Sequence, residues 1–126
     1  MSINKEAFAK FADALDSGEY KQGYGVLCDQ DGYCVWGVAT DIVYEELGFT
    51  KVYDWEYAAY EKEEEGGFKY RGTFIPPSPV TRHYFGEEGS GTREEIFGKL
   101  LEMNDNKTHT FPEIAAYIRE EILKED

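Results

Sequence analysis

Apolar residues recur every three or four positions in several segments of the chain, and this spacing predicts amphipathic helices. The expected helices cover residues 3–16, 34–47, 92–103 and 110–122. The stretch of residues 34–47 begins with a run that carries no charge, so we expect this helix to lie at the centre of the core.

Polar residues and a glycine stand where three of these helices are expected to begin or end. Thr92 with Glu95, and Thr110 with Glu113, each have the spacing of a capping box at a helix start. Gly48 is placed to end the second helix, because glycine readily adopts the left-handed conformation found just beyond helix ends.

Alternating apolar and polar residues predict strands in two other parts of the chain. Residues 19–33 are interpreted as a short hairpin that turns at residues 30–32. Residues 49–75 are interpreted as aromatic strands around a glutamate-rich turn, and a helix over residues 54–64 is the alternative. After a proline-rich break, residues 80–85 are expected to form one or two helical turns.

These elements together predict an α+β fold, in which about four helices pack on a small antiparallel sheet. The 126 residues suit a single compact domain over residues 1–126, since no linker divides them. The aromatic and acidic residues 49–75 are expected to be an insertion in that domain. With 41% apolar residues, the chain can bury a core without help from a disulfide or a metal.

The charge balance changes which partners are expected. The chain has 26 acidic and 13 basic residues, a net charge of −13. This charge disfavours direct contact with a nucleic acid backbone or an anionic membrane. It allows a partner protein with a basic surface, or a small ligand held in a local basic pocket, and it is also explained by solubility alone.

Cysteine and histidine are scarce. Cys28 and Cys34 do not make a disulfide framework; they could face each other across the expected hairpin, but reduced thiols are the favoured interpretation. The spacing of the two cysteines and two histidines fits no zinc site, so we expect no metal and no cofactor. Residues 1–15 lack the apolar run of a signal peptide, and no run is long enough to span a membrane, which predicts a cytoplasmic protein.

Cys34 is the sharpest candidate for chemistry. It stands at an expected helix start, where backbone N–H groups favour a thiolate nucleophile, and His83 or His109 could act as the base. Asp105, Asn104 or Asp41 could orient that histidine. The alternatives are that Cys34 packs as a small buried apolar residue, and that residues 104–105 only end one helix and bind the connector to the next.

A second candidate set combines aromatic and basic residues in the middle of the chain. Such residues suit a nucleobase or phosphate ligand, and they also concentrate at protein interfaces. The alternative is ordinary core aromatics with arginines at the surface. The candidate ligand or partner residues are Trp55, Tyr57, Tyr70, Arg71, Arg82 and Tyr84.

Three segments together resemble a family of small, uncharacterised proteins of bacteriophages and prophages. The first is Gly-Glu-Tyr-Lys-Gln-Gly-Tyr-Gly at residues 18–25, leading to Gly-Tyr-Cys-Val-Trp-Gly-Val at residues 32–38. The second is the segment 75–86. The third is Leu-Glu-Met-Asn-Asp at residues 101–105, followed by Thr-Phe-Pro-Glu-Ile-Ala-Ala-Tyr-Ile at residues 110–118. Met103 stands where the pattern has leucine. The resemblance covers about half of the chain and implies a phage protein located in the cytoplasm of the bacterial host.

Charge and resemblance lead to a hypothesis of binding rather than catalysis. The favoured function is a phage accessory protein, an acidic inhibitor that occupies a basic surface on a host protein, such as a defence factor. The first alternative is sequestration of a nucleotide-like small molecule by the aromatic and arginine set. The second alternative is a thiol-dependent enzyme that uses Cys34.

Overall fold

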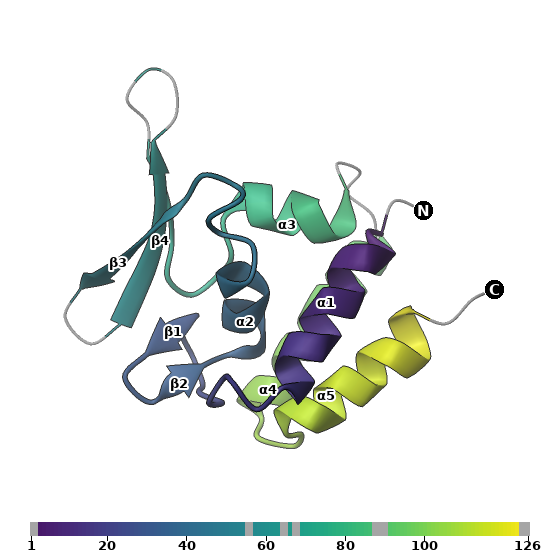
Figure 1. The fold of residues 1–126 in the computed structure, drawn as a ribbon. Coiled ribbons are helices and arrows are strands. Elements are labelled where there is room, and N and C mark those ends of the chain that lie inside the picture. Colours follow the sequence, from purple (N-terminus) through teal and green to yellow (C-terminus); the bar gives the residue numbers. More distant parts are fainter. Residues whose placement is uncertain (1–2, 55–56, 64–65, 67–68, 87–90, 124–126) are drawn as a thin grey trace.

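The helices and the sheet lie on different sides of the molecule (Figure 1). The computed structural model describes residues 3–54, 57–63, 66, 69–86 and 91–123. In this part of the chain a five-stranded antiparallel sheet and five α-helices form one compact α+β domain. The predicted fold class is therefore confirmed, with one helix more than the four expected as main elements.

The first and last helices pack side by side (Figure 1). Helix α1 (Lys5–Asp16) begins at Asn4, whose side chain accepts a hydrogen bond from the Ala7 N–H at 3.1 Å. Helix α5 (Phe111–Tyr117) begins at Thr110 with the predicted capping box and continues as a π-helical turn over Ile118–Ile122. These two helices match the predicted ranges because their apolar faces repeat regularly.

The other helices are α2 (Val35–Asp41), α3 (Ser78–Phe85) and α4 (Gly91–Asp105). Helix α2 ends earlier than predicted, and residues 42–48 form a series of turns instead. The Thr40 hydroxyl bonds the Trp36 carbonyl within the helix, and the Val43 N–H then bonds the Thr40 carbonyl three residues back. This tightening ends the regular α-helix before Gly48, whose φ of +85° leads the chain into the sheet.

Residues 49–75 supply most of the sheet, so the strand interpretation is confirmed and the helix alternative over residues 54–64 is wrong. Strands β3 (Thr50–Asp54), β4 (Tyr57–Glu63) and β5 (Lys69–Gly72) are antiparallel, and β4 lies between the other two. Strand β4 also pairs with β1 (Cys28–Asp29), which pairs with β2 (Gly32–Tyr33).

The hairpin predicted over residues 19–33 is much shorter than expected. Only β1 and β2 are strands, with the turn between them, and the residues before Cys28 run as irregular chain with one bridge from Gln22 to Tyr33. Gly32 explains the close packing here: its φ is +147°, and a Cβ at this position would lie 2.4 Å from the Lys21 carbonyl oxygen. The irregular chain therefore lies directly against the hairpin.

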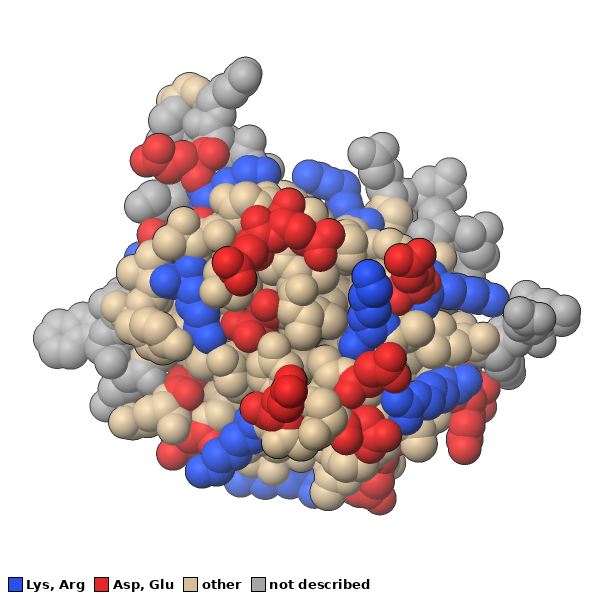
Figure 2. Space-filling model, in the orientation of Figure 1, with Lys and Arg blue, Asp and Glu red and all other residues tan. Residues whose placement is uncertain are grey.

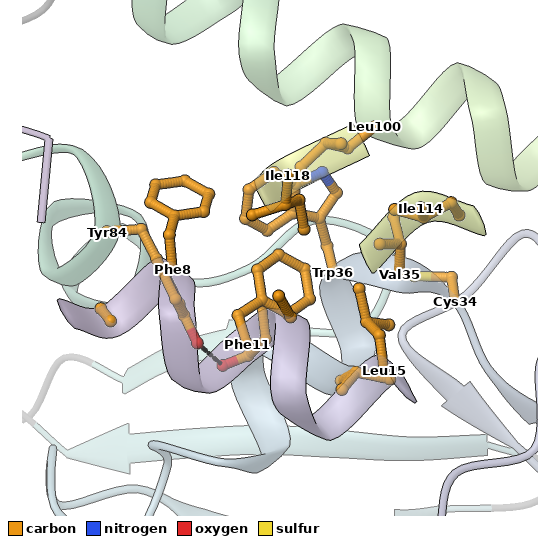
Figure 3. Packing of buried hydrophobic residues seen from close by; sticks show 14 of the residues in the cluster. Phe8, Phe11, Leu15, Cys34, Val35, Trp36, Tyr84, Leu100, Ile114 and Ile118 are labelled. Carbon is orange, nitrogen blue, oxygen red and sulfur yellow. Dashed lines mark hydrogen bonds between the residues drawn. The ribbon is translucent and has the colours of Figure 1, made fainter. Parts of the chain in front are cut away.

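Aromatic side chains from α1, α2 and α3 meet in the core (Figure 3), and Phe97 of α4 packs against them. The Trp36 indole stacks on Phe97 with ring centroids 4.8 Å apart, and its N–H donates to the Phe97 carbonyl at 3.1 Å. The Tyr84 ring packs edge-on against Phe8, and its hydroxyl donates to the Ala39 carbonyl at 2.6 Å. Because these polar tips are satisfied inside, the large rings stabilise the core without an unpaired donor.

Candidate functional site

Cys34 is built into the start of α2 and is buried. Its side chain is 1% exposed, and its Sγ accepts the Gly37 N–H at 3.3 Å as the cap of the helix. Figure 3 shows it among core residues near Val35 and Ile114. Burial raises the pKa of the Cys34 thiol to about 11. At neutral pH the group is therefore a neutral thiol inside the core, which does not favour the thiol-dependent enzyme.

Two of the groups named as possible partners of Cys34, His83 and Asp105, make their hydrogen bonds to other groups, although the Asp105 charge is near enough to contribute to the raised pKa of Cys34. His83 is half-buried on α3, where its backbone carbonyl accepts the Asn4 side-chain amide at 3.0 Å. Asp105 is exposed at the end of α4 and accepts from the side-chain amide of the neighbouring Asn104 at 3.0 Å. In the described part of the chain neither side chain has a hydrogen bond to Cys34, so the predicted set Cys34, His83 and Asp105 is not assembled.

The second histidine serves a turn. The His109 Nδ1 atom lies 2.8 Å from the hydroxyl oxygen of Thr108, and the His109 carbonyl accepts the side-chain amide of Gln22 at 3.0 Å. The candidate base for the thiol is therefore not found at His109 either.

The aromatic and arginine candidates are spread over the molecule. Tyr84, one of these candidates, is fully buried in the core, and its ring has no exposed surface for a ligand or partner. Arg82, its neighbour in α3, is exposed, and Arg71 pairs with Glu61 at 3.0 Å on the sheet. Tyr57 is half-buried beside Phe74, with ring centroids 6.2 Å apart.

The remaining two candidates are only partly placed. Trp55 lies outside the described residues. Tyr70 is in β5 opposite Lys62, and its side chain lies outside the described part. The described residues of this set therefore do not form a stacking site for a nucleobase.

Asn104 links the end of α4 to the chain between α1 and β1, whereas the sequence alternative was that it binds the connector after α4. It is fully buried; its side chain accepts from the Gln22 amide and donates to the Gly23 carbonyl, both at 3.0 Å. The Asn-Asp pair thus does end α4 structurally, but its amide binds the chain between α1 and β1. Gln22, Gly23 and Asn104 belong to two of the segments that carried the resemblance, and their role here is structural.

A second network, which sequence reasoning missed, joins the helices to the sheet. The Lys51 ammonium on β3 lies 3.0 Å from Asp41 Oδ1 at the end of α2 and donates to the Tyr33 hydroxyl at 2.7 Å. The hydroxyls of Tyr20 and Tyr60 donate to the same carboxylate at 3.0 and 2.9 Å. Lys51 and Asp41 are only 11% and 15% exposed, so this is an internal ion pair.

The network raises the pKa of its tyrosines and of its lysine. Burial, the Asp41 charge and the hydrogen bond to Asp41 raise the pKa of Tyr20 and of Tyr60 above their usual range. Burial alone would lower the pKa of Lys51, but the hydrogen bonds to Tyr33 and Asp41 raise it overall. The arrangement holds a cation, a carboxylate and neutral phenols at neutral pH.

Two surface hollows carry glutamates. One, of about 370 Å³, lies between α1, the turns after α2 and α3, and is lined by Asn4, Glu6, Ala7, Lys10, Ile42, Val43, Glu46 and His83. The other, of about 360 Å³, lies on the sheet and is lined by Gly48, Thr50, Val52, Glu61, Lys62 and Glu63. The negative carboxylates at both hollows would repel a phosphate-bearing ligand.

The described residues show neither a metal-holding cluster nor a membrane-spanning helix. The described residues contain no group of three or more His, Cys, Asp and Glu side chains placed to hold a metal ion. None of the helices, within the part of the chain searched, is long and apolar enough to cross a membrane.

The fold and these networks define a small α+β domain in which every buried polar side-chain atom of the described residues has a hydrogen-bond partner. The chain belongs to the family described as domain of unknown function DUF8296, whose model matches residues 3–122. Searches of curated proteins and of solved structures found no match.

The buried thiols give a direct prediction about reactivity. Because the pKa of Cys34 is about 11 and the side chain is 1% exposed, we expect the native thiol to react with Ellman's reagent at least about a hundredfold more slowly than an unfolded cysteine at pH 7. A Cys28→Ala variant isolates Cys34, and urea should restore the fast rate. Rapid labelling of the native variant would reopen the case for a reactive thiol.

The tyrosine network predicts a loss of stability at alkaline pH. Tyr20 and Tyr60 have raised pKa values in the folded protein, so the folded state binds more protons than the unfolded state above about pH 10. The stability they provide is complete below that pH and falls as pH rises. Urea denaturation from pH 7 to pH 11 measures the slope, which should be shallower in Tyr60→Phe. An unchanged slope would contradict this assignment.

Proposed function

We propose that this protein is a non-catalytic phage accessory protein that inhibits a host protein, such as a defence factor, by covering a basic surface on it. The phage context comes from the resemblance of residues 18–38, 75–86 and 101–118 to phage and prophage proteins. The mode of action comes from the placement of charge and reactive groups.

The observation that carries the proposal is the separation between an acidic surface and an inert interior. Among acidic side chains whose burial is described, all are exposed except Asp29, Asp41 and Glu61, which are half-buried. Cys34, the group best placed in sequence for chemistry, is a buried helix cap. The surface is therefore the part of the molecule that is equipped to act.

The net charge of the whole molecule, and not one acidic patch, is what attracts the proposed partner. On the face seen in Figure 2, acidic and basic side chains are interspersed instead of gathered by sign. A net charge of −13 still attracts a basic partner over distances up to about 10 Å at physiological ionic strength and raises the association rate. Long-range attraction of this kind supplies partner choice, while contacts at the docked surface supply the rest of the affinity.

Sequestration of a nucleotide-like molecule has less support. Tyr84 is buried in the core, and Arg71 already binds Glu61. Both hollows present two glutamates. A broad nucleotide panel is expected to leave the melting temperature unchanged, since only a ligand that binds the native state raises it.

The test is to retain host proteins on the immobilised chain and to measure the association of each retained protein at increasing salt. A partner of the proposed kind associates much more slowly as salt rises. Glu94→Gln with Glu95→Gln, two exposed positions on α4, should slow association, whereas Lys10→Gln, which removes an exposed positive charge, should speed it. Binding that is indifferent to salt and to these changes would refute the proposal.

A further inference from the structure

Strand β3 is an edge of the sheet. The strand order is β2, β1, β4, β3, and β5 pairs with β4 on the side away from β3. Among the described residues only β4 pairs with β3, so the backbone groups on its outer side have no strand partner. In Figure 1 the hairpin of β3 and β4 lies at one side of the molecule, away from α1, α4 and α5.

This edge lacks the features by which proteins usually protect an exposed strand. Its register with β4 runs without a bulge from Thr50 to Asp54, and it contains no proline. The lysine that could guard it, Lys51, is turned inward to Asp41 and is 11% exposed. Tyr53 and Val52 are instead 75% and 36% exposed. A regular edge with two exposed apolar side chains is a template for one more strand.

The surroundings of the edge specify the chemistry of that strand. The hollow of about 360 Å³ beside it is lined by Thr50 and Val52 of β3, by Glu61, Lys62 and Glu63 of β4, and by Gly48. In the register of the hairpin, Thr50 faces Glu61 and Val52 faces Ala59, so these side chains share one face of the sheet. The added strand would lie about 10 Å from β4, two strand spacings away, so only long side chains such as Lys or Arg would extend over β3 toward the β4 glutamates on the same face.

We infer that the β3 edge binds an extended, basic segment of a partner protein, which adds a strand to the sheet and places Lys or Arg side chains near Glu63, since Glu61 is already paired with Arg71. This inference rests on the proposed function and names its docking site. A second copy of the chain fits less well, because each copy carries a net charge of −13 and the two would repel.

The experiment uses a randomised library of short peptides displayed on yeast and selected on the full-length protein. Selected peptides should carry basic residues at alternate positions, and their affinity should fall as salt rises. Amide hydrogen exchange with a bound peptide should show new protection within residues 50–54. Protection confined to other elements, or self-association of the protein through this edge, would overturn the inference.

Two proline variants give a matched control. Amide groups of adjacent strand residues point in opposite directions, so one of Val52 and Tyr53 donates toward β4 and the other toward the free edge. Of Val52→Pro and Tyr53→Pro, the variant that removes the N–H pointing to the free edge should keep the wild-type melting temperature. The same variant should weaken peptide binding about tenfold, because it loses main-chain hydrogen bonds to the peptide. Tyr53→Thr keeps the amide and separates the loss of the ring from the loss of the N–H.

The outcomes distinguish the two proposals. Salt-sensitive peptides that bind away from residues 50–54 would remove the strand site and leave the proposed function standing. Peptides protected at residues 50–54 but indifferent to salt would keep the edge as a binding site and remove the basic partner. Wild-type affinity in the folded proline variant would also refute the strand site. If both proline variants unfold, the exchange pattern alone decides.

Discussion

Gly37→Ala is expected to lower the free energy of unfolding by about 3 kcal/mol or more, the upper range for an overpacked core position. A Cβ on residue 37 would lie 1.7 Å from the Leu27 carbonyl oxygen and 2.6 Å from its carbon. Both obstacles are backbone atoms, and the Cys34 N–H holds the same carbonyl at 3.2 Å. Since residues 34–40 are all buried, α2 has no room to move away.

Urea denaturation measures this loss, with the fluorescence of Trp36 as a probe because that indole is buried in the core. Gly98→Ala is the matched control. Gly98 lies within α4, and nothing stands within 4 Å of an added Cβ, so this variant should gain up to about 1 kcal/mol. A Gly37→Ala variant as stable as the wild type would mean that α2 does not rest on Leu27.

Periodic faces made α1 and α5 predictable from sequence. The residues that fill their stripes, such as Phe8, Phe11 and Ile114, are the ones that the fold buries. The end of α2 was not predictable in the same way, because it depends on the hydrogen bond that the Thr40 hydroxyl donates to the Trp36 carbonyl within the helix. Local hydrogen bonds of this kind compete with helix propagation without changing the apolar pattern.

Burial of individual aromatics was beyond the reach of the sequence. Tyr84 and Tyr53 are the same residue type in aromatic surroundings, yet one is fully buried and the other is 75% exposed. The difference arises because α3 turns Tyr84 toward Phe8 of α1, while β3 is at the edge of the sheet. Which elements become neighbours decides this, and a single sequence carries no direct signal for it.

Residues that were candidates for chemistry, or that carried the family resemblance, hold elements of the fold together. Cys34 and Gly37 fix the start of α2, and Gln22 binds Asn104 across 82 positions of the chain. Short-range spacing showed that these residues were unusual but not what they touch. The Asp41–Lys51 pair gave even less signal, since charged residues ten positions apart are most often both solvated.

Lys51→Met is expected to cost about 3 kcal/mol, because it leaves the Asp41 carboxylate largely buried without its cation. Two tyrosine hydroxyls would still donate to the carboxylate, which keeps the loss at the lower end of the range for broken internal pairs. Asp41→Asn should cost a similar amount by leaving the Lys51 ammonium without a counter-charge. Urea denaturation at pH 7 measures both.

An exposed set of ion pairs between α1 and the π-helical turn gives a comparison for the internal pair. Arg119 binds Asp13 and Asp16 at 2.9 and 3.1 Å, but all three side chains are well exposed, so Arg119→Met should change stability by less than about 1 kcal/mol. The double variant Asp41→Asn with Lys51→Met removes both internal charges and should be more stable than the sum of the single losses predicts. Strict additivity would mean that Asp41 and Lys51 do not depend on each other for their contribution to stability.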